Sequence, residues 1–216
     1  FLFINSFQDA ITYIDLRSVP QTSFLQFPET WKFSNYAEAM QMYVYNTKSE
    51  KLYIYQMLLN SLWFCFCGVA FPVLTCCCTG YVLSKYNFRG KELIYTVIIF
   101  TMTVPVVGSD ASALKLAHAL GTYNNPITKL VTSFTGYGFN FMVMYAFFKN
   151  ISWSYAEAVF IDGGNNFTAF FKVMLPQAKM AIVTLCVISF ITQWNAYEGA
   201  LIYFPDYLPL AAGLYK

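Results

Sequence analysis

The feature that most constrains the fold of this chain is a long stretch, Leu52 to Ser84, in which no side chain carries a charge. Three more uncharged, mostly apolar stretches follow at Leu93 to Ser109, Leu130 to Phe148 and Met180 to Tyr197. A helix of about 20 apolar residues crosses a bilayer. Charged residues make up only 11% of the chain, against about 25% in soluble domains. These features predict an all-α integral membrane protein embedded in a lipid bilayer.

The apolar stretches also predict how the chain is divided. The membrane domain should cover residues 52–204, with a kink in its first span at Pro72, because proline removes a helical hydrogen bond. A polar segment at 149–177 interrupts it. The four expected spans are at about residues 58–83, 93–109, 130–148 and 178–203.

Basic residues are distributed unevenly among the loops that join these spans. The loops after the first and third spans should lie in the cytoplasm, because lysine and arginine collect on that side. Residues 1–51 are then an external segment, in which Phe1 to Phe7 is a candidate stub of an earlier span. Residues 205–216 are then expected to form an external loop. The two cytoplasmic loops carry Lys85, Arg89, Lys91, Lys149, Lys172 and Lys179, against Lys115 and Lys129 in the loop between them.

Composition excludes several other classes of protein. The net charge of +2 is too small to indicate nucleic-acid binding. All six cysteines lie in apolar stretches and His118 is the single histidine, so neither a zinc site nor a disulfide framework is expected. The chain begins at Phe1 without a visible signal peptide, and we interpret it as a fragment of a longer protein.

Between the second and third spans, residues 111–120 have the pattern of a short helix. Ser112, Lys115 and His118 recur every third residue among apolar neighbours. We expect this helix to lie flat at the outer surface and to end at Gly121.

The cytoplasmic segment at 154–176 predicts a helix, a sharp turn and a second helix. Ser152 or Ser154 can cap the first helix. Ser154 and Glu157 have the spacing of a capping box, in which a hydroxyl and a carboxylate each bind a free backbone N–H group. Gly163-Gly164 signals the turn after a first helix that runs to about Asp162. We expect the second helix at about Phe167 to Met174, ended by Leu175-Pro176.

This segment resembles the EAA loop of permease subunits in bacterial ABC importers. The family pattern is Glu-Ala-Ala, three residues, Gly, nine residues, Ile, one residue and Leu-Pro. The corresponding residues here are Glu157-Ala158-Val159, Gly163, Val173 and Leu175-Pro176, at the same spacing. Two mild apolar replacements, valine for alanine and valine for isoleucine, separate the chain from the pattern.

Further matches in the expected order resemble the carbohydrate branch of that family, the maltose-type permeases. The resemblance implies the transmembrane-domain fold of ABC importers, with four of an expected six spans present. The first span would be mostly missing and the sixth absent. The matches are Asn35-Tyr36, Glu38-Ala39, Asn60-Ser61-Leu62, Gly80-Tyr81, Phe88-Arg89-Gly90, Thr101-Met102, Val104-Pro105, Leu120-Gly121, Asn124-Asn125, Trp194-Asn195 and Leu208-Pro209-Leu210.

The resemblance also implies a mechanism and a set of partners. Such a chain is a multi-pass protein of the bacterial inner membrane that binds no cofactor and is not an enzyme. ATP and Mg²⁺ bind to cytoplasmic ATPase subunits, in agreement with the lack of a phosphate-binding loop in this chain. A second permease subunit completes the pathway, and an external binding protein delivers the sugar. The residues expected to couple the chain to the ATPase are Glu157, Ala158, Asp162, Gly163, Leu175 and Pro176.

Polar residues within the predicted spans are candidates for the substrate pathway. Amide and carboxylate groups can bind sugar hydroxyls. The competing interpretation is that these groups only form hydrogen bonds between helices. The candidates are Asn60, Asn140, Gln193, Asn195 and Glu198.

Three alternatives remain. An ABC importer for a non-sugar solute would share the EAA-like segment. A membrane enzyme would need a convergent catalytic set, and Glu198 is the single acidic residue within a predicted span. A fragment without its first and last spans would expose packing surfaces, so we expect no transport by residues 1–216 alone.

Overall fold

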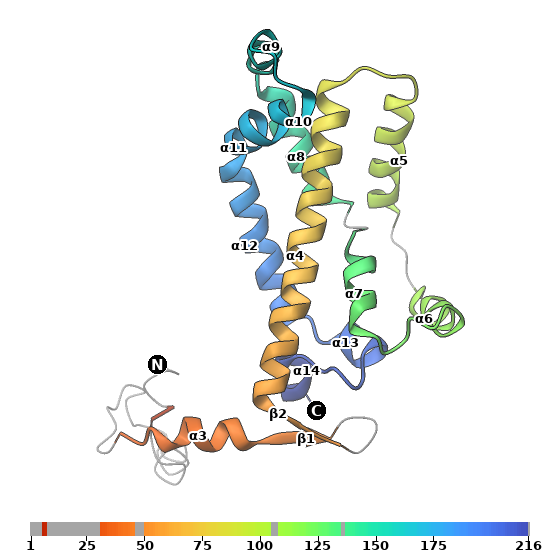
Figure 1. The fold of residues 1–216 in the computed structure, drawn as a ribbon. Coiled ribbons are helices and arrows are strands. Elements are labelled where there is room, and N and C mark those ends of the chain that lie inside the picture. The colour runs from red at the N-terminus through yellow and green to blue at the C-terminus, as the bar shows by residue number, and fades with distance from the viewer. Residues whose placement is uncertain (1–5, 8–30, 46–49, 105–107, 135–136, 216) are drawn as a thin grey trace, which may run out of the picture.

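The structure is a computed structural model that describes residues 6–7, 31–45, 50–104, 108–134 and 137–215. Within these ranges it is mostly helical, with the shorter helices arranged around one long helix (Figure 1). Pro105 and most of the external segment lie outside the described residues. The elements are α3 (Ser34–Gln41), β1 (Tyr43–Tyr45), β2 (Lys51–Tyr53), α4 (Ile54–Lys85), α5 (Lys91–Thr103), α6 (Asp110–Ala119), α7 (Pro126–Ser133), α8 (Phe139–Asn150), α9 (Ser154–Ile161), α10 (Asn166–Thr168), η1 (Ala169–Met174), α11 (Leu175–Gln177), α12 (Lys179–Asn195), α13 (Glu198–Tyr203) and α14 (Leu210–Tyr215).

The central helix α4 confirms the first long apolar stretch as a helix. Its 32 residues include Pro72 without a break in the helix. At 1.5 Å per residue it is about 48 Å long, which exceeds the roughly 30 Å of hydrocarbon in a bilayer. Among the described residues, α4 is the one continuous helix that is long and apolar enough to cross a membrane by itself.

Among the described residues, no other predicted span is one continuous helix over its full predicted length. Helix α5 ends at Thr103, six residues before the predicted end of its span at Ser109. The stretch 130–148 is shared between α7 and α8, and Gly138, with φ of +156°, precedes α8. The stretch 178–203 is shared between α12 and α13. Residues 166–177 and α12 are together long and apolar enough for one span, although they meet at 71°. The count of four spans therefore stays a prediction.

The segment before α4 contains a β-hairpin that the all-α prediction missed. Strands β1 and β2 pair antiparallel, with Tyr43 opposite Tyr53 and their rings 5.9 Å apart. Large aromatic side chains favour such cross-strand pairs. The short helix expected at 111–120 is confirmed as α6, and Gly121, with φ of +65°, ends it. In Figure 1, α3 and α6 lie across the direction of α4.

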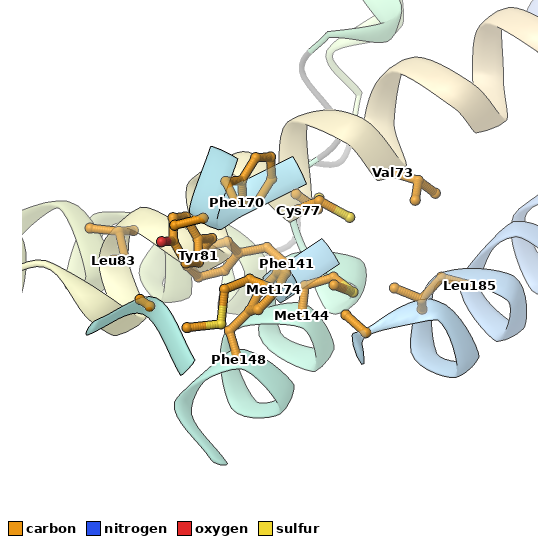
Figure 2. Close-up of a cluster of buried hydrophobic side chains, with 14 residues drawn as sticks. Val73, Cys77, Tyr81, Leu83, Phe141, Met144, Phe148, Phe170, Met174 and Leu185 are labelled. Atoms are coloured by element: carbon orange, nitrogen blue, oxygen red, sulfur yellow. The ribbon is translucent and has the colours of Figure 1, made fainter. Parts of the chain in front are cut away.

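The main core joins α4 to α8, α12 and the segment 151–178. Gly80 allows α4 and α8 to approach closely, because an added Cβ would lie 3.1 Å from the backbone nitrogen of Tyr145. Small residues permit such close packing of membrane helices. Figure 2 shows the rings and sulfur atoms that fill the space between the elements. The buried members are Val73, Cys76, Cys77, Tyr81, Leu83, Phe141, Met144, Phe148, Ala156, Ala169, Phe170, Met174, Ala178 and Leu185.

Candidate functional site

The EAA-like segment forms the first of its two predicted helices as α9, at one end of the molecule (Figure 1). Ala156 is fully buried and Val159 half-buried, so one side of α9 packs onto the core. The other side is open to solvent. Ile161 is 86% exposed and Tyr155 is 51% exposed. The helix therefore presents an apolar surface that nothing in the described part of the chain covers.

The predicted capping box at the start of α9 is wrong. The N-cap residue is Trp153, which caps no backbone group with its side chain. Ser154 lies inside the helix, and its N–H group donates to the hydroxyl of Ser152 at 3.3 Å. Because the helix begins one residue earlier than the box requires, Glu157 lies exposed in its first turn. A carboxylate there favours the helix through its dipole rather than through a reciprocal cap.

The predicted turn after α9 is confirmed, and two glycines make it possible. Gly163 has φ of +80°, and its N–H group donates to the carbonyl of Phe160 at 3.1 Å. The N–H group of Gly164 donates to the carbonyl of Val159 at 2.8 Å. These two bonds define a Schellman motif, which satisfies the last carbonyl groups of a helix. The turn directs the chain back toward the core.

Gly164 is the more crowded of the two glycines. A Cβ atom there would lie 2.5 Å from Cγ1 and 2.9 Å from the carbonyl oxygen of Val159. We expect Gly164→Ala to lower the free energy of unfolding by about 1–3 kcal/mol, as overpacking usually does. Thermal unfolding of the purified full-length protein in detergent would measure it. Adding Val159→Ala should restore part of the loss, because it removes the Cγ1 contact and leaves the carbonyl contact. Equal stability of Gly164→Ala and wild type would contradict this account of the turn.

The second helix is longer than predicted. Asn165 caps it, since its side-chain oxygen accepts the N–H group of Thr168 at 2.8 Å. The helix then passes through the π-helical turn η1 and ends at Gln177, so Pro176 lies inside it and not at its end. The sharp bend falls at Ala178, whose N–H group is shared between two carbonyl groups of the preceding turn. Proline lacks an N–H group, which weakens the helix at this point.

Contacts from the end of α4 hold the segment in place. The hydroxyl of Tyr86 donates to the side-chain oxygen of Asn166 at 3.1 Å, and the Tyr86 and Trp153 rings are 5.7 Å apart. The ammonium group of Lys85 donates to the carbonyl of Ile151. No sequence motif signalled these contacts, because they join residues more than 60 positions apart. They make α9 and the second helix one body with α4.

The structure places the predicted coupling residues on two parts of this segment. Of the six predicted coupling residues, the four that come first in the sequence lie on the exposed side of α9 and in the turn at its end. The other two, Leu175 and Pro176, lie on α11. Leu175 is half-buried against the core and Pro176 is exposed. The exposed group on α9 and its turn is Glu157, Ala158, Asp162 and Gly163.

Two of the predicted pathway residues form hydrogen bonds within the bundle. The amide of Asn60 on α4 donates to the carbonyl of Leu208 at 3.2 Å. The amide of Asn140 on α8 donates to the hydroxyl of Ser189 on α12 at 3.3 Å. Both contacts are those expected of side chains that connect packed elements.

The other three pathway candidates lie near the end of α12. Gln193 is half-buried against α4, at Gly68. The amide of Asn195 donates to the carbonyl of Ile191 within its own helix, at 2.8 Å. Glu198 is exposed in the first turn of α13, just after the break between the helices. The five candidates thus lie on α4, α8, the end of α12 and the start of α13.

Comparison with known families identifies the fold. Residues 77–215 match the family described as "Binding-protein-dependent transport system inner membrane component". The chain belongs to this family. Its members are membrane components of transport systems and not enzymes. The matched region includes most of the core and the whole of the EAA-like segment.

Individual relatives agree with this assignment. The chain is 28% identical to the diacetylchitobiose uptake system permease protein NgcG of Streptomyces coelicolor, over 79% of this chain and 54% of that protein. It is 27% identical to the polygalacturonan/rhamnogalacturonan transport system permease protein YtcP of Bacillus subtilis, over 91% of this chain and 65% of that protein. The chain therefore spans between about half and two thirds of the length of these relatives.

A solved structure shows the same fold. A bacterial ABC transporter involved in the import of the acidic polysaccharide alginate superposes with a TM-score of 0.77 at 23% identity, over 99% of this chain and 70% of that one. The inner-membrane permease fold expected from the sequence resemblance is thus confirmed. This superposition includes the hairpin and the divided helices described above, because it covers nearly the whole chain.

Proposed function

We propose that this chain is the transmembrane permease subunit of an ATP-driven importer of oligosaccharides. The observation that carries the proposal is the EAA-like segment, which forms a helix, a Schellman turn and a second helix fixed to the end of α4. Its exposed surface is apolar, and a stable apolar surface of this kind is typical of a site for a protein partner. We infer that cytoplasmic ATPase subunits, which hold ATP and Mg²⁺, dock there.

The arrangement of the two ends of the molecule supports this proposal. The loop after α4 contacts the EAA-like segment through Tyr86 and Trp153, so the two loops predicted to be cytoplasmic lie at the same end. In Figure 1 the elements α3, α6, α13 and α14 lie toward the opposite end. This is the arrangement that the distribution of lysine and arginine predicts for a multi-pass protein of the inner membrane.

A rigid connection between the docking segment and α4 gives a route for mechanical coupling. Movement of an attached ATPase would move α9, and the contacts of Tyr86, Lys85 and Phe170 would pass that movement to α4 and α8. Rocking of such packed helices opens a pathway alternately to each side. A second permease subunit would form the other half of the pathway, and an external binding protein would deliver the sugar.

The choice of an oligosaccharide rests on the relatives. The names of several curated relatives specify saccharides, including diacetylchitobiose, polygalacturonan and alpha-glucosides. We keep Asn60, Asn140, Gln193, Asn195 and Glu198 as the proposed pathway residues. The breaks that separate α7 from α8 and α12 from α13 support a pathway beside them, because membrane proteins tolerate non-helical backbone where it lines a cavity.

A pull-down in mild detergent would test the proposal. The tagged full-length permease is purified from its native membrane, and its partners are identified by mass spectrometry. We expect an ATPase subunit, a second permease and an external binding protein. Uptake of labelled saccharides by the recovered assembly then tests the solute class. Recovery of the permease without any ATPase would refute the coupling function of the EAA-like segment.

A further inference from the structure

Lys129 on α7 is a half-buried cation without a matching anion in the described part of the chain. Its ammonium group lies 5.8 Å from the centre of the Phe64 ring. Its titratable neighbours among the described residues are the thiols of Cys65 and Cys67, and no described carboxylate forms an ion pair with it. Holding a partly buried cation without an anion costs free energy, so this position is a candidate site for an anionic ligand.

A second polar side chain approaches the same face of α4. Gln193 on α12 packs so tightly against Gly68 that a Cβ atom there would lie 2.6 Å from the Gln193 side-chain carbon Cδ. Phe64 and Gly68 are four residues apart and therefore lie one above the other on the helix. Lys129 and Gln193 thus meet adjacent turns of one face of α4, from two different helices.

The position of these residues along α4 fits the entry of an imported solute. Phe64 and Gly68 lie in the half of α4 that begins at Ile54, and the docking segment is fixed to the other end, at Lys85. Phe64 is buried and its ring packs edge to face against that of Phe204, with ring centres 5.1 Å apart, so the ammonium group lies beside a packed aromatic pair.

We propose that Lys129 and Gln193 form a binding site for a carboxylated saccharide. The ammonium group of Lys129 binds the carboxylate, and the amide of Gln193, which both donates and accepts, binds a neighbouring hydroxyl. An anionic ligand would offset the cost of holding a cation partly out of water. This inference rests on the proposed importer function and adds the class of saccharide to it.

The test compares one acidic and one neutral probe. The native full-length importer is reconstituted in phosphatidylcholine vesicles, with and without phosphatidylglycerol, and uptake of labelled trigalacturonate and galactotriose is measured. We expect the wild-type importer to take up trigalacturonate. The K129Q variant should take up trigalacturonate about tenfold more slowly, which is the usual effect of losing a hydrogen bond to a charged group. K129R should retain most of the uptake. K115Q, which removes an exposed lysine of α6, should match wild type.

Each of the other outcomes overturns the proposal. Uptake of galactotriose alone would leave the sugar-importer function intact and refute the acidic site. Uptake of neither probe by an assembly that contains its ATPase would refute both. An equal effect of K129Q on both probes would assign Lys129 a structural role. If K129Q reduced uptake only in vesicles that contain phosphatidylglycerol, Lys129 would be assigned to binding a lipid headgroup. Membrane abundance and ATPase recovery of K129Q are measured alongside, so that misfolding is detected separately.

Discussion

Replacing Gly163 with leucine should abolish recovery of the ATPase while the permease remains in the membrane. Gly163 is exposed, and a Cβ atom built on it meets nothing within 4 Å, so the permease itself has space for a side chain. We expect a docked ATPase to leave no space for that side chain, because Gly163 lies two residues after the exposed end of α9. We expect the amount of ATPase that co-purifies with full-length Gly163→Leu to fall by at least about tenfold, the loss produced by roughly 1.4 kcal/mol.

The chain offers a matched control at Gly90. This glycine also has a positive φ, +94°, and open space around its Cβ position, and it lies in the other loop predicted to be cytoplasmic. Leucine at either glycine costs about 1–2 kcal/mol for the left-handed backbone. Because the backbone strain is the same in Gly163→Leu and Gly90→Leu, the two variants differ only in where the leucine is placed. Gly90→Leu should keep its ATPase. Normal recovery by Gly163→Leu, or equal losses by both variants, would remove the turn from the docking site.

Truncating Phe148 should produce the largest loss of stability. Phe148 on α8 is fully buried, with its ring 5.6 Å from that of Tyr81 on α4 and 6.4 Å from that of Phe170 in η1. Replacing a buried phenylalanine with alanine costs about 3–5 kcal/mol, because contacts are lost and a cavity remains. We expect the apparent Tm of the purified full-length permease in detergent to fall by about 10 °C.

Phe171 provides the comparison for this measurement. It is next to Phe170 in sequence but 50% exposed, so its removal leaves no closed cavity. Phe171→Ala should shift the apparent Tm by no more than about 2 °C, in line with exposed substitutions. If both variants lowered the Tm equally, the junction of α4, α8 and η1 would not be the packed core described above. Phe148→Ala should also reduce ATPase-driven transport, since this junction carries the docking segment.

The structural account of the EAA-like segment shows how far local sequence signals extend. The helix, the glycine turn and the second helix were all predictable, because each depends on residues within a few positions of one another. The start of α9 was predicted incorrectly, since Ser154 and Glu157 match a capping box only if Ser154 is the N-cap and the helix begins at Tyr155. The packing of Ala156 against the core and the fit of Trp153 beside Tyr86 place its start one residue earlier.

The substrate pathway was less predictable for a different reason. The amide of Asn60 is bonded to a carbonyl 148 residues later, and that of Asn140 to a hydroxyl on another helix. A polar residue in an apolar stretch predicts that some partner exists and not which partner. Lys129 was counted only as a loop charge that sets orientation, because its approach to Phe64 depends on how α7 packs on α4.

The sequence by itself determined the membrane class and the permease family, and it predicts which side is cytoplasmic. Apolar stretch length, loop charge and motif spacing are all properties of neighbouring residues. Tertiary structure alone decided where the helices divide, where the chain bends by 71° at Ala178, and which polar side chains meet on α4. These features depend on contacts between distant segments. Hydropathy specifies that a helix is buried in lipid or protein, but the shapes of the packed side chains determine which neighbour it contacts.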